Sequence, residues 1–133
     1  MVNVIPNTGK VFIGATIQTA LAVSTIKLFK NDMVPDVGTV LADFTEADFS
    51  GYAAQAVATW GVPYIDQVNG GVSITAPAHQ FQAANPTTVP NTVYGYYLED
   101  TGGNLVQAGR FDAPIDMVQP SDGFVLAVTI NQQ

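Results

Sequence analysis

The chain contains no cysteine, one histidine and one tryptophan among its 133 residues, and only 11% of the residues are charged. Without cysteine, the protein has no disulfide, no thiolate nucleophile and no cysteine-bound zinc. Basic residues are also scarce, since four Lys and Arg stand against eleven Asp and Glu and give a formal net charge of −7. A chain of this charge repels phosphate backbones, so nucleic acid is not an expected partner.

The sequence also lacks a run of about 20 apolar residues, the length needed to span a membrane, so no membrane partner is expected. The segment VFIGATIQTALAV at 11–23 imitates the apolar region of a signal peptide. It contains polar residues and follows a segment with a single charge and Pro6, which do not fit such a signal. We therefore expect residues 1–23 to be an N-terminal arm or packing segment, buried as a helix or a strand, with Thr8 placed to cap a helix.

Apolar residues are plentiful, because 47% of the chain is hydrophobic. A chain of this size and composition buries enough apolar surface to offset its conformational entropy, which excludes a disordered protein and favours one domain. Much of the remaining surface is amide and hydroxyl, a composition common on surfaces that pack against other proteins. We expect a single domain over 24–133.

Short segments of alternating apolar and polar residues predict β-strands from residue 24 onward. Val72, Ile74 and Ala76 alternate with polar residues, and the same period continues in FVLAVTIN near the end of the chain. About seven to nine short strands are typical of an all-β fold, a β-sandwich or jelly roll. The strands are expected at 25–30, 53–60, 72–76, 79–83, 92–99, 105–111 and 124–130.

A β-hairpin is predicted where EDTGGN joins the strands on either side. Gly102 and Gly103 are free to take the positive φ that a tight turn requires. Proline, which cannot donate to a sheet, is expected between the strands and not inside them. The prolines concerned are Pro35, Pro63, Pro77, Pro86, Pro90, Pro114 and Pro120.

Three carboxylates crowd into the stretch FTEADFSGY at 44–52 and the residue before it: Asp43, Glu46 and Asp48. A calcium loop requires acids at alternate positions, then glycine and a bidentate Glu. The spacing here is three and two, and Phe49 intervenes between the last acid and the glycine. We therefore expect a structural role for these carboxylates, with no metal and no cofactor.

The same stretch predicts a short helical turn over 45–49. Thr45 is placed as its N-cap, and Asp48 lies in the first turn, where the helix dipole favours negative charge. Gly51 would close the turn with a positive φ before a strand that starts at Tyr52.

Catalytic candidates are few. His79 is predicted to share a strand face with Phe81, which favours packing or hydrogen bonding over general base catalysis. Ser73 lacks the second glycine of a nucleophile elbow. Glu46 or Glu99 would be the natural acid of a glycoside hydrolase, although pairs of this kind occur in any acidic protein. We expect a protein that is not an enzyme and has no catalytic residue.

Five aromatic residues leave two alternatives open. Trp60, Tyr64, Tyr94, Tyr96 and Tyr97 suit ordinary core and sheet packing, and they would equally suit a sugar-stacking surface or the core of a protein interface. Their spacing does not separate a sugar from a protein as the partner.

Two long stretches resemble small structural proteins of tailed bacteriophages, of the kind that decorate or cement heads. They are TIKLFKNDMVPDVGTVLADFTEADFSGYAAQAV and NTVYGYYLEDTGGNLVQAGRFDAPIDMVQPSDGFVLAVTI, which cover nearly the whole chain after residue 24. The resemblance implies a homo-oligomeric virion protein that is made in the host cytoplasm and binds the major capsid protein on the capsid surface. The resemblance does not identify any functional residue in this chain. The alternative is a tail-associated or receptor-binding module that recognises carbohydrate.

Overall fold

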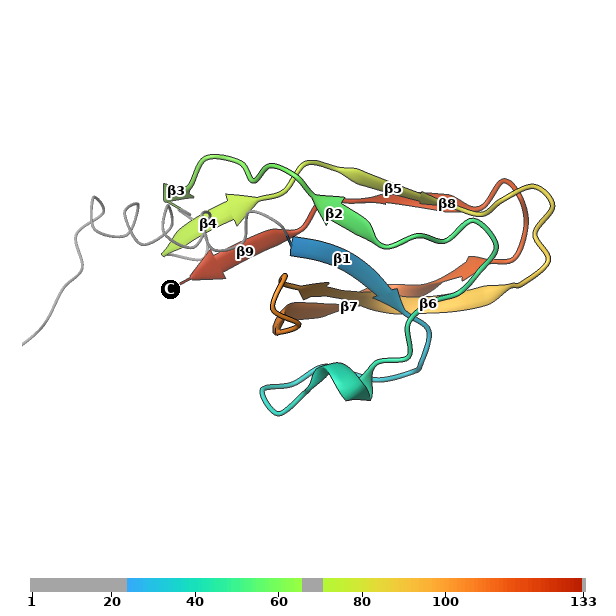
Figure 1. Cartoon of the computed structure of the whole chain (residues 1–133), viewed down its shortest axis with the longest axis horizontal. Coiled ribbons are helices and arrows are strands. Elements are labelled where there is room, and N and C mark those ends of the chain that lie inside the picture. The colour runs from blue at the N-terminus through green and yellow to red at the C-terminus, as the bar shows by residue number, and fades with distance from the viewer. Residues whose placement is uncertain (1–23, 66–70, 133) are drawn as a thin grey trace, which may run out of the picture. The chain divides into compact units, whose positions relative to one another are not determined.

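The computed structural model describes residues 24–65 and 71–132, so the arm or helix predicted at 1–23 lies outside the described residues. Within these ranges the regular structure is almost entirely β, which confirms the predicted all-β, sandwich-like fold (Figure 1). The chain groups into two compact units. The described part of unit 1 is 57–65, 71–78 and 127–132, and unit 2 is 24–56 with 79–126. The single domain expected over 24–133 stays a prediction.

Two sheets lie mainly on the chain of unit 2, with antiparallel pairing of β1 with β6, of β6 with β7 and of β5 with β8. Four strands follow the order β2-β1-β6-β7, and β5 pairs separately with β8. The strands are β1 (Ser24–Phe29), β2 (Gln55–Val57), β5 (His79–Gln82), β6 (Asn91–Glu99), β7 (Leu105–Met117) and β8 (Gly123–Leu126).

Aromatic side chains join the two sheets of unit 2. Phe81 of β5 stacks on Phe124 of β8 with ring centroids 5.5 Å apart, and Phe124 meets Phe111 of β7 edge-on at 5.6 Å. Phe111 continues the row to Tyr96 of β6. Because aromatic rings bury large apolar areas and favour such tilted and offset contacts, this row holds the β5-β8 pair against the larger sheet.

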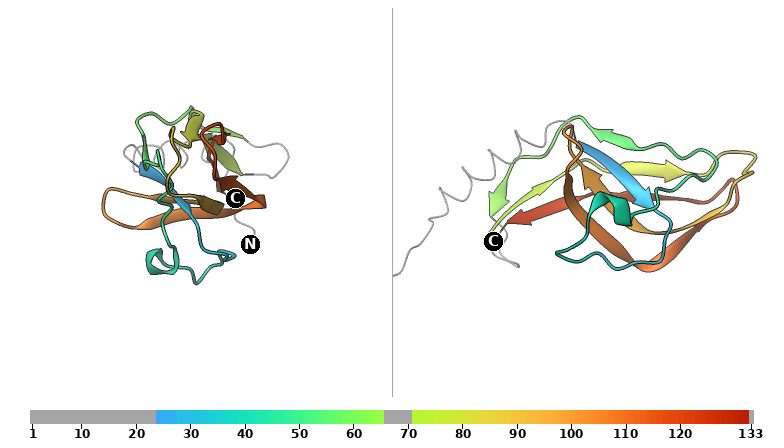
Figure 2. Two further views of the ribbon diagram at one scale, coloured as in Figure 1. Left: turned by 90° about the vertical axis from the view of Figure 1, so that its right-hand side faces the viewer. Right: turned by 60° about the horizontal axis from the view of Figure 1, so that its bottom comes forward.

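The opposite face of the larger sheet is covered by the loop that follows β1 (Figure 2). This loop contains the single turn of 3₁₀ helix η1 (Leu41–Asp43), the one helical element among the described residues. Phe44, which follows η1, stacks on Tyr97 of β6 with the rings nearly parallel and 4.5 Å apart, and it also packs on Phe29. The central strand β6 therefore has packed side chains on both faces, Tyr96 on one and Tyr97 on the other, while much of the edge strand β7 stays exposed.

The described residues of unit 1 form a small antiparallel sheet of three strands, in the order β3-β4-β9. Its strands are β3 (Tyr64–Ile65), β4 (Val72–Thr75) and β9 (Thr129–Gln132). Ile74 pairs with Ile130 across β4 and β9, and Ile74 is fully buried. The alternation in GVSIT thus predicts β4 correctly.

The helical turn predicted over 45–49 is wrong, and Thr45 caps no helix. This stretch runs extended beside the end of β1, where the Lys30 amide donates to the Thr45 carbonyl and the Ala47 amide donates to the Leu28 carbonyl, both at 2.9 Å. These bonds pair the carbonyl of the buried Leu28 and the amide of Lys30, the residue after β1, and a buried backbone group without a partner would be costly. The helical turn forms earlier, at η1.

Two further predictions differ from the structure in the second half of the chain. The strand predicted at 124–130 is two strands, since β8 ends at Leu126 and pairs with β5, while β9 begins at Thr129 and pairs with β4. Pro114, expected between strands, lies inside β7. It is tolerated there because β7 is an edge strand and its register with β6 shifts between Val93 and Gly95.

The hairpin between β6 and β7 forms as predicted. Asp100 organises its turn, since Oδ1 accepts the amides of Gly102 and Asn104 at 2.9 Å each. Gly103 has φ +78°, and Gly102 does not take a positive φ.

Candidate interaction surface

The three carboxylates of the acidic stretch contact different partners. Asp43 closes η1, because its Oδ2 accepts the amide of Val40 at 2.9 Å. Its backbone carbonyl accepts the side-chain amide of Asn31 at 2.9 Å, and the same Asn31 receives the Thr45 amide on Oδ1 at 2.8 Å. Asp43 and Asn31 together fix the loop that covers the sheet.

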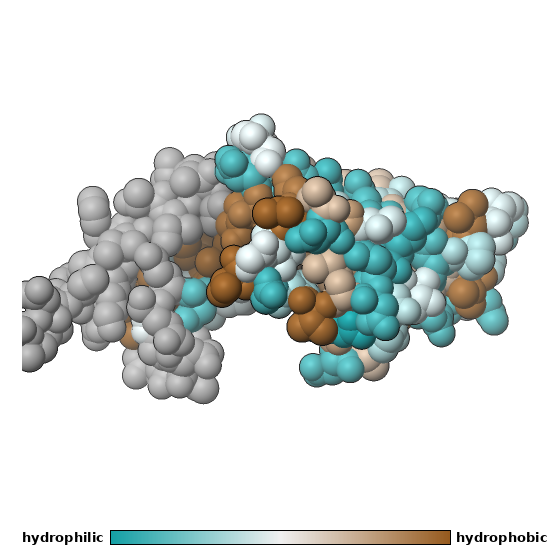
Figure 3. All heavy atoms as spheres, turned by 90° about the horizontal axis from the view of Figure 1, so that it is seen from below, coloured by the Kyte–Doolittle hydropathy of each residue, from teal (hydrophilic) through white to brown (hydrophobic). Residues whose placement is uncertain are grey.

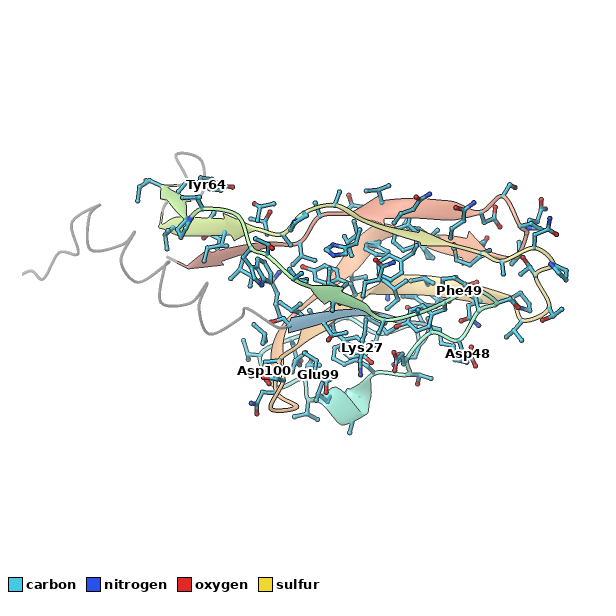
Figure 4. The ribbon with its side chains drawn as sticks, turned by 45° about the horizontal axis from the view of Figure 1, so that its top comes forward. Lys27, Asp48, Phe49, Tyr64, Glu99 and Asp100 are labelled. Atoms are coloured by element: carbon cyan, nitrogen blue, oxygen red, sulfur yellow. The ribbon has the colours of Figure 1, made fainter. Side chains whose placement is uncertain are left out.

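Glu46 lies in a chain of contacts that starts at β1. The hydroxyl of the half-buried Tyr52 donates to Glu46 at 2.9 Å and accepts the Leu28 amide at 3.3 Å. Lys27 lies 4.0 Å from Glu46 and 2.8 Å from Glu99, and Figure 4 shows Lys27 and Glu99 side by side. The hydrogen bond to Glu99 raises the pKa of Lys27, while burial raises the pKa of Tyr52.

Asp48 is held separately from the other two carboxylates. Lys30 lies 2.8 Å from its Oδ1, and the side-chain amide of Asn91 donates to the same oxygen at 2.9 Å. Asn91 also accepts the backbone amide of Asp48 at 2.7 Å. These hydrogen bonds, from Lys30 first and Asn91 second, hold the pKa of Asp48 below its usual value.

The acidic stretch therefore attaches the loop to the sheet. Each carboxylate accepts from a backbone amide, a hydroxyl or a lysine, and they do not converge on a shared point. Among the described residues, no group of three or more His, Asp or Glu side chains is placed to hold a metal ion. The candidates for a glycosidase acid, Glu46 and Glu99, both form ion pairs with Lys27.

The remaining catalytic candidates also lie in packed positions. His79 is partly buried on β5, on the same face as the fully buried Phe81, as predicted. Ser73 is fully buried on β4, and its hydroxyl accepts the side-chain amide of Asn131 at 2.7 Å. Ser73 is thus part of the β4-β9 pairing.

Four of the five candidate aromatic residues are buried or contact other side chains of the fold. Trp60 and Tyr97 are buried, and burial raises the pKa of Tyr97 to about 12. Tyr96 accepts a hydrogen bond from Gln107 at 2.7 Å, and Tyr94 lies under the guanidinium of Arg110. Tyr64 differs, because 47% of it is exposed on β3 at the surface of unit 1 (Figure 4).

Large apolar side chains at the surface are mostly valines. In unit 1, Val62 is 82% exposed close to Tyr64. In unit 2, Val34, Val37 and Val40 are exposed on the loop after β1. Seen from the loop side, brown apolar atoms gather there among teal hydrophilic ones (Figure 3).

Charge is distributed unevenly between the two units. The described residues of unit 1 include no Asp, Glu, Lys or Arg. In unit 2 the basic residues Lys27, Lys30 and Arg110 each contact a carboxylate of the same unit. The two charged residues of unit 1, Lys10 and Asp66, lie outside the described residues, and unit 2 has no described cation without an acidic neighbour.

Sequence reasoning missed several residues that shape this surface. Arg110 reaches from β7 to Asp32, and Asn31 and Asn91 bracket the acidic stretch although they are distant from it along the chain. A local pattern cannot reveal such long-range pairs. The turn at Pro35-Asp36 did carry a signal, because proline, aspartate and the nearby Gly38 are residue types that favour turns.

Within the described ranges, no helix has the length and apolar character needed to cross a membrane. No family model, curated protein or solved structure matches this chain.

Proposed function

We propose that this chain is a non-enzymatic structural protein of a phage virion, which binds the major capsid protein lattice and stabilises the head. The observation that carries the proposal is the exposure of two large apolar side chains on unit 1, Val62 and Tyr64, in a unit that has only one acidic and one basic residue, Asp66 and Lys10. The resemblance of the sequence to decoration and cement proteins gives the proposal its biological setting.

An uncharged surface suits assembly for a physical reason. Burying a charge in an interface costs desolvation energy, and the buried cores of interfaces are accordingly depleted of charged residues and enriched in tyrosine. Amide and hydroxyl groups form hydrogen bonds across such an interface at a much lower desolvation cost. We assign the surface around Val62 and Tyr64 to contacts between copies of the chain, since one acidic and one basic residue give unit 1 no net charge and therefore little electrostatic repulsion.

The positions of the polar side chains favour this function over catalysis. Glu46, Asp48 and Ser73 each satisfy a local hydrogen bond of the fold. A cement protein works through many simultaneous contacts, which slow dissociation because all of them must break together. Such a protein needs no reactive group.

Mass spectrometry of separated heads and tails, prepared from purified virions of the phage that encodes this chain, tests the proposal. We expect the chain in the head fraction, in an amount that scales with the major capsid protein. Its presence in tails alone would contradict the proposal. Absence from heads together with clear glycan-array binding would favour the alternative, a carbohydrate-recognition module in which Tyr64 stacks on sugar.

A further inference from the structure

The loop after β1 (31–44, called here the valine loop) is anchored at its start by Arg110. The guanidinium of Arg110 contacts the Asp32 carboxylate at 2.6 Å and donates to the Met33 carbonyl at 2.9 Å. It also lies over the ring of Tyr94, 5.2 Å from the centroid. A planar, multidentate group with three partners leaves the loop base little freedom.

The middle and the end of the valine loop are fixed by the loop itself. Asp36 Oδ1 accepts the Gly38 amide at 2.8 Å and also binds the Thr39 hydroxyl, which in turn accepts the Asp36 amide. At the end, Asp43 caps η1 and Phe44 stacks on Tyr97. The loop is therefore ordered without a partner, and binding costs it little further conformational entropy.

This ordered loop presents aliphatic side chains to water. Val34 and Val40 are 72% and 56% exposed, and Val37 is fully exposed at the tip of the Asp36 turn. The hydrogen bonds of the turn involve Asp36, Gly38 and Thr39, so the fold does not require an apolar residue at position 37. A preorganised loop with apolar side chains held in solvent is suited to burial in a partner.

The surface extends from the valine loop onto the start of β7. One open hollow of about 390 Å³ lies between residues 35–39 of the loop and Leu105–Ala108 of β7. A second hollow is lined by residues 39–42 and 103–105. Val106, itself exposed, belongs to the lining of the first. The surface therefore offers a partner both exposed valine side chains and two hollows that side chains of the partner could fill.

Charge decides which partner fits. Asp32, Asp36 and Asp43 lie on the valine loop, and of the three only Asp32 contacts a described cation. A second copy placed on this surface would bring two acidic loops together, which costs energy. A partner with basic residues around an apolar socket would instead complement the loop.

We propose that the valine loop inserts Val34, Val37 and Val40 into an apolar, basic-rimmed socket on the major capsid protein. This inference rests on the proposed function and assigns its capsid-binding surface. Contacts between copies use the surface of unit 1 around Val62 and Tyr64, and contact with the capsid uses the valine loop.

Binding of the purified full-length chain to heads that lack it tests the inference. The variant Val34→Ser, Val37→Ser, Val40→Ser removes the apolar side chains of the loop without adding charge. The matched control is Val89→Ser, Val118→Ser, Val125→Ser, which changes three exposed valines elsewhere in unit 2. Melting temperatures identify a variant that fails to fold, and in that case Val37→Ser alone replaces the triple variant.

We expect the loop variant to bind heads at least about 100-fold more weakly than the wild type, as the loss of three buried valines implies. The control should bind within about threefold of the wild type, because exposed positions outside an interface contribute little. Equal binding by the loop variant and the control would overturn the inference. If the wild type itself fails to bind the heads, the proposed function falls as well.

Two further measurements test the nature of the partner. Asp36→Asn keeps an oxygen that accepts the turn hydrogen bonds and removes one negative charge, so it should weaken binding and reduce the dependence of affinity on salt. Tighter binding of Asp36→Asn would contradict a basic rim. Sedimentation of the isolated loop variant should match that of the wild type, and a shift to smaller species would show that the loop binds a second copy instead.

Discussion

At the scale of single residues, the carboxylates act as hydrogen-bond acceptors within the fold. Asp48 illustrates this role, because Lys30 and Asn91 both donate to its Oδ1 although the side chain remains 59% exposed. A lowered pKa in the folded state means that the ionised form is stabilised by folding. Screening by water limits the size of this effect.

The pH dependence of stability should reveal the contribution of Asp48. Its folded pKa lies below the unfolded value of about 3.9, so its contribution is present above that value and is lost as pH falls through the lowered pKa. We expect Asp48→Asn to melt below the wild type at pH 7, and the difference to shrink under strongly acidic conditions. Asp112→Asn, which removes an exposed charge from β7, is the control. A difference that grows on acidification would contradict the assignment.

Calcium should leave the melting temperature unchanged. Asp43 and Asp48 are directed to different partners, Val40 and Lys30, and do not share a ligand position. A site that bound calcium only in the folded state would raise the melting temperature by mass action. A calcium-dependent rise that disappears in the Asp43→Asn, Asp48→Asn double variant would show that these carboxylates form a metal site.

Gly51 should not tolerate a side chain. It has φ +92°, as the sequence predicted, and a Cβ at this position would lie 2.7 Å from the backbone nitrogen of Ala84. Gly51→Ala should therefore lower the free energy of unfolding by at least about 1 kcal/mol. Gly38→Ala is the control, because its Cβ would meet only Asp36 Oδ1 at 3.4 Å. Similar urea midpoints for both variants would argue against strain at Gly51.

At the scale of elements, alternation of apolar and polar residues predicted where strands form but not which strands they pair with. The segment 124–130 keeps its two-residue period through the passage from β8 to β9, since Val128 is buried and Thr129 exposed. The alternation therefore does not reveal that the pairing strand changes from β5 to β4. Pro114 was misplaced for a related reason, because a sequence does not reveal that β7 is an edge strand.

The acidic stretch shows the same limit for helices. Thr45 and Asp48 satisfy the pattern of an N-cap, yet unpaired backbone groups of β1 draw residues 45–47 into an extended conformation. The free energy gained by pairing backbone groups at the end of β1 exceeds the contribution of an N-cap, which is about 1 kcal/mol. The three carboxylates each contact a group of the fold, and the element that is capped is η1, through Asp43.

Capping should consequently depend on Asp43 and not on Thr45. Asp43→Ala removes the acceptor of the Val40 amide and should cost about 0.5 to 2 kcal/mol of unfolding free energy in urea. Thr45→Ala should cost much less, because its backbone hydrogen bonds to Asn31 and Lys30 remain. The reverse order of effects would mean that a helical turn forms at 45–49 in solution.

At the scale of the whole molecule, the acidic residues that give the chain its net charge of −7 lie mainly in unit 2. The described residues of unit 1 carry no charge, while the acidic valine loop belongs to unit 2. This distribution supports our assignment of contacts between copies to unit 1 and of capsid contact to the valine loop.

Self-association should depend on the exposed apolar residues of unit 1. We expect Val62→Ser, Tyr64→Ser to shift the sedimentation coefficient of the isolated protein toward smaller species, since it removes exposed apolar area at 82% and 47% exposed positions. Val89→Ser, Val118→Ser should sediment as the wild type does. An unchanged coefficient for the first variant would place the contact between copies elsewhere.

A reconstruction of the intact virion would show where the chain lies. We expect density for the sheets β2-β1-β6-β7 and β5-β8 over the capsid lattice, with the valine loop bound to the major capsid protein. Density for this fold at the tail, or a complete capsid lattice that carries none of it, would contradict the claim that the chain cements the head.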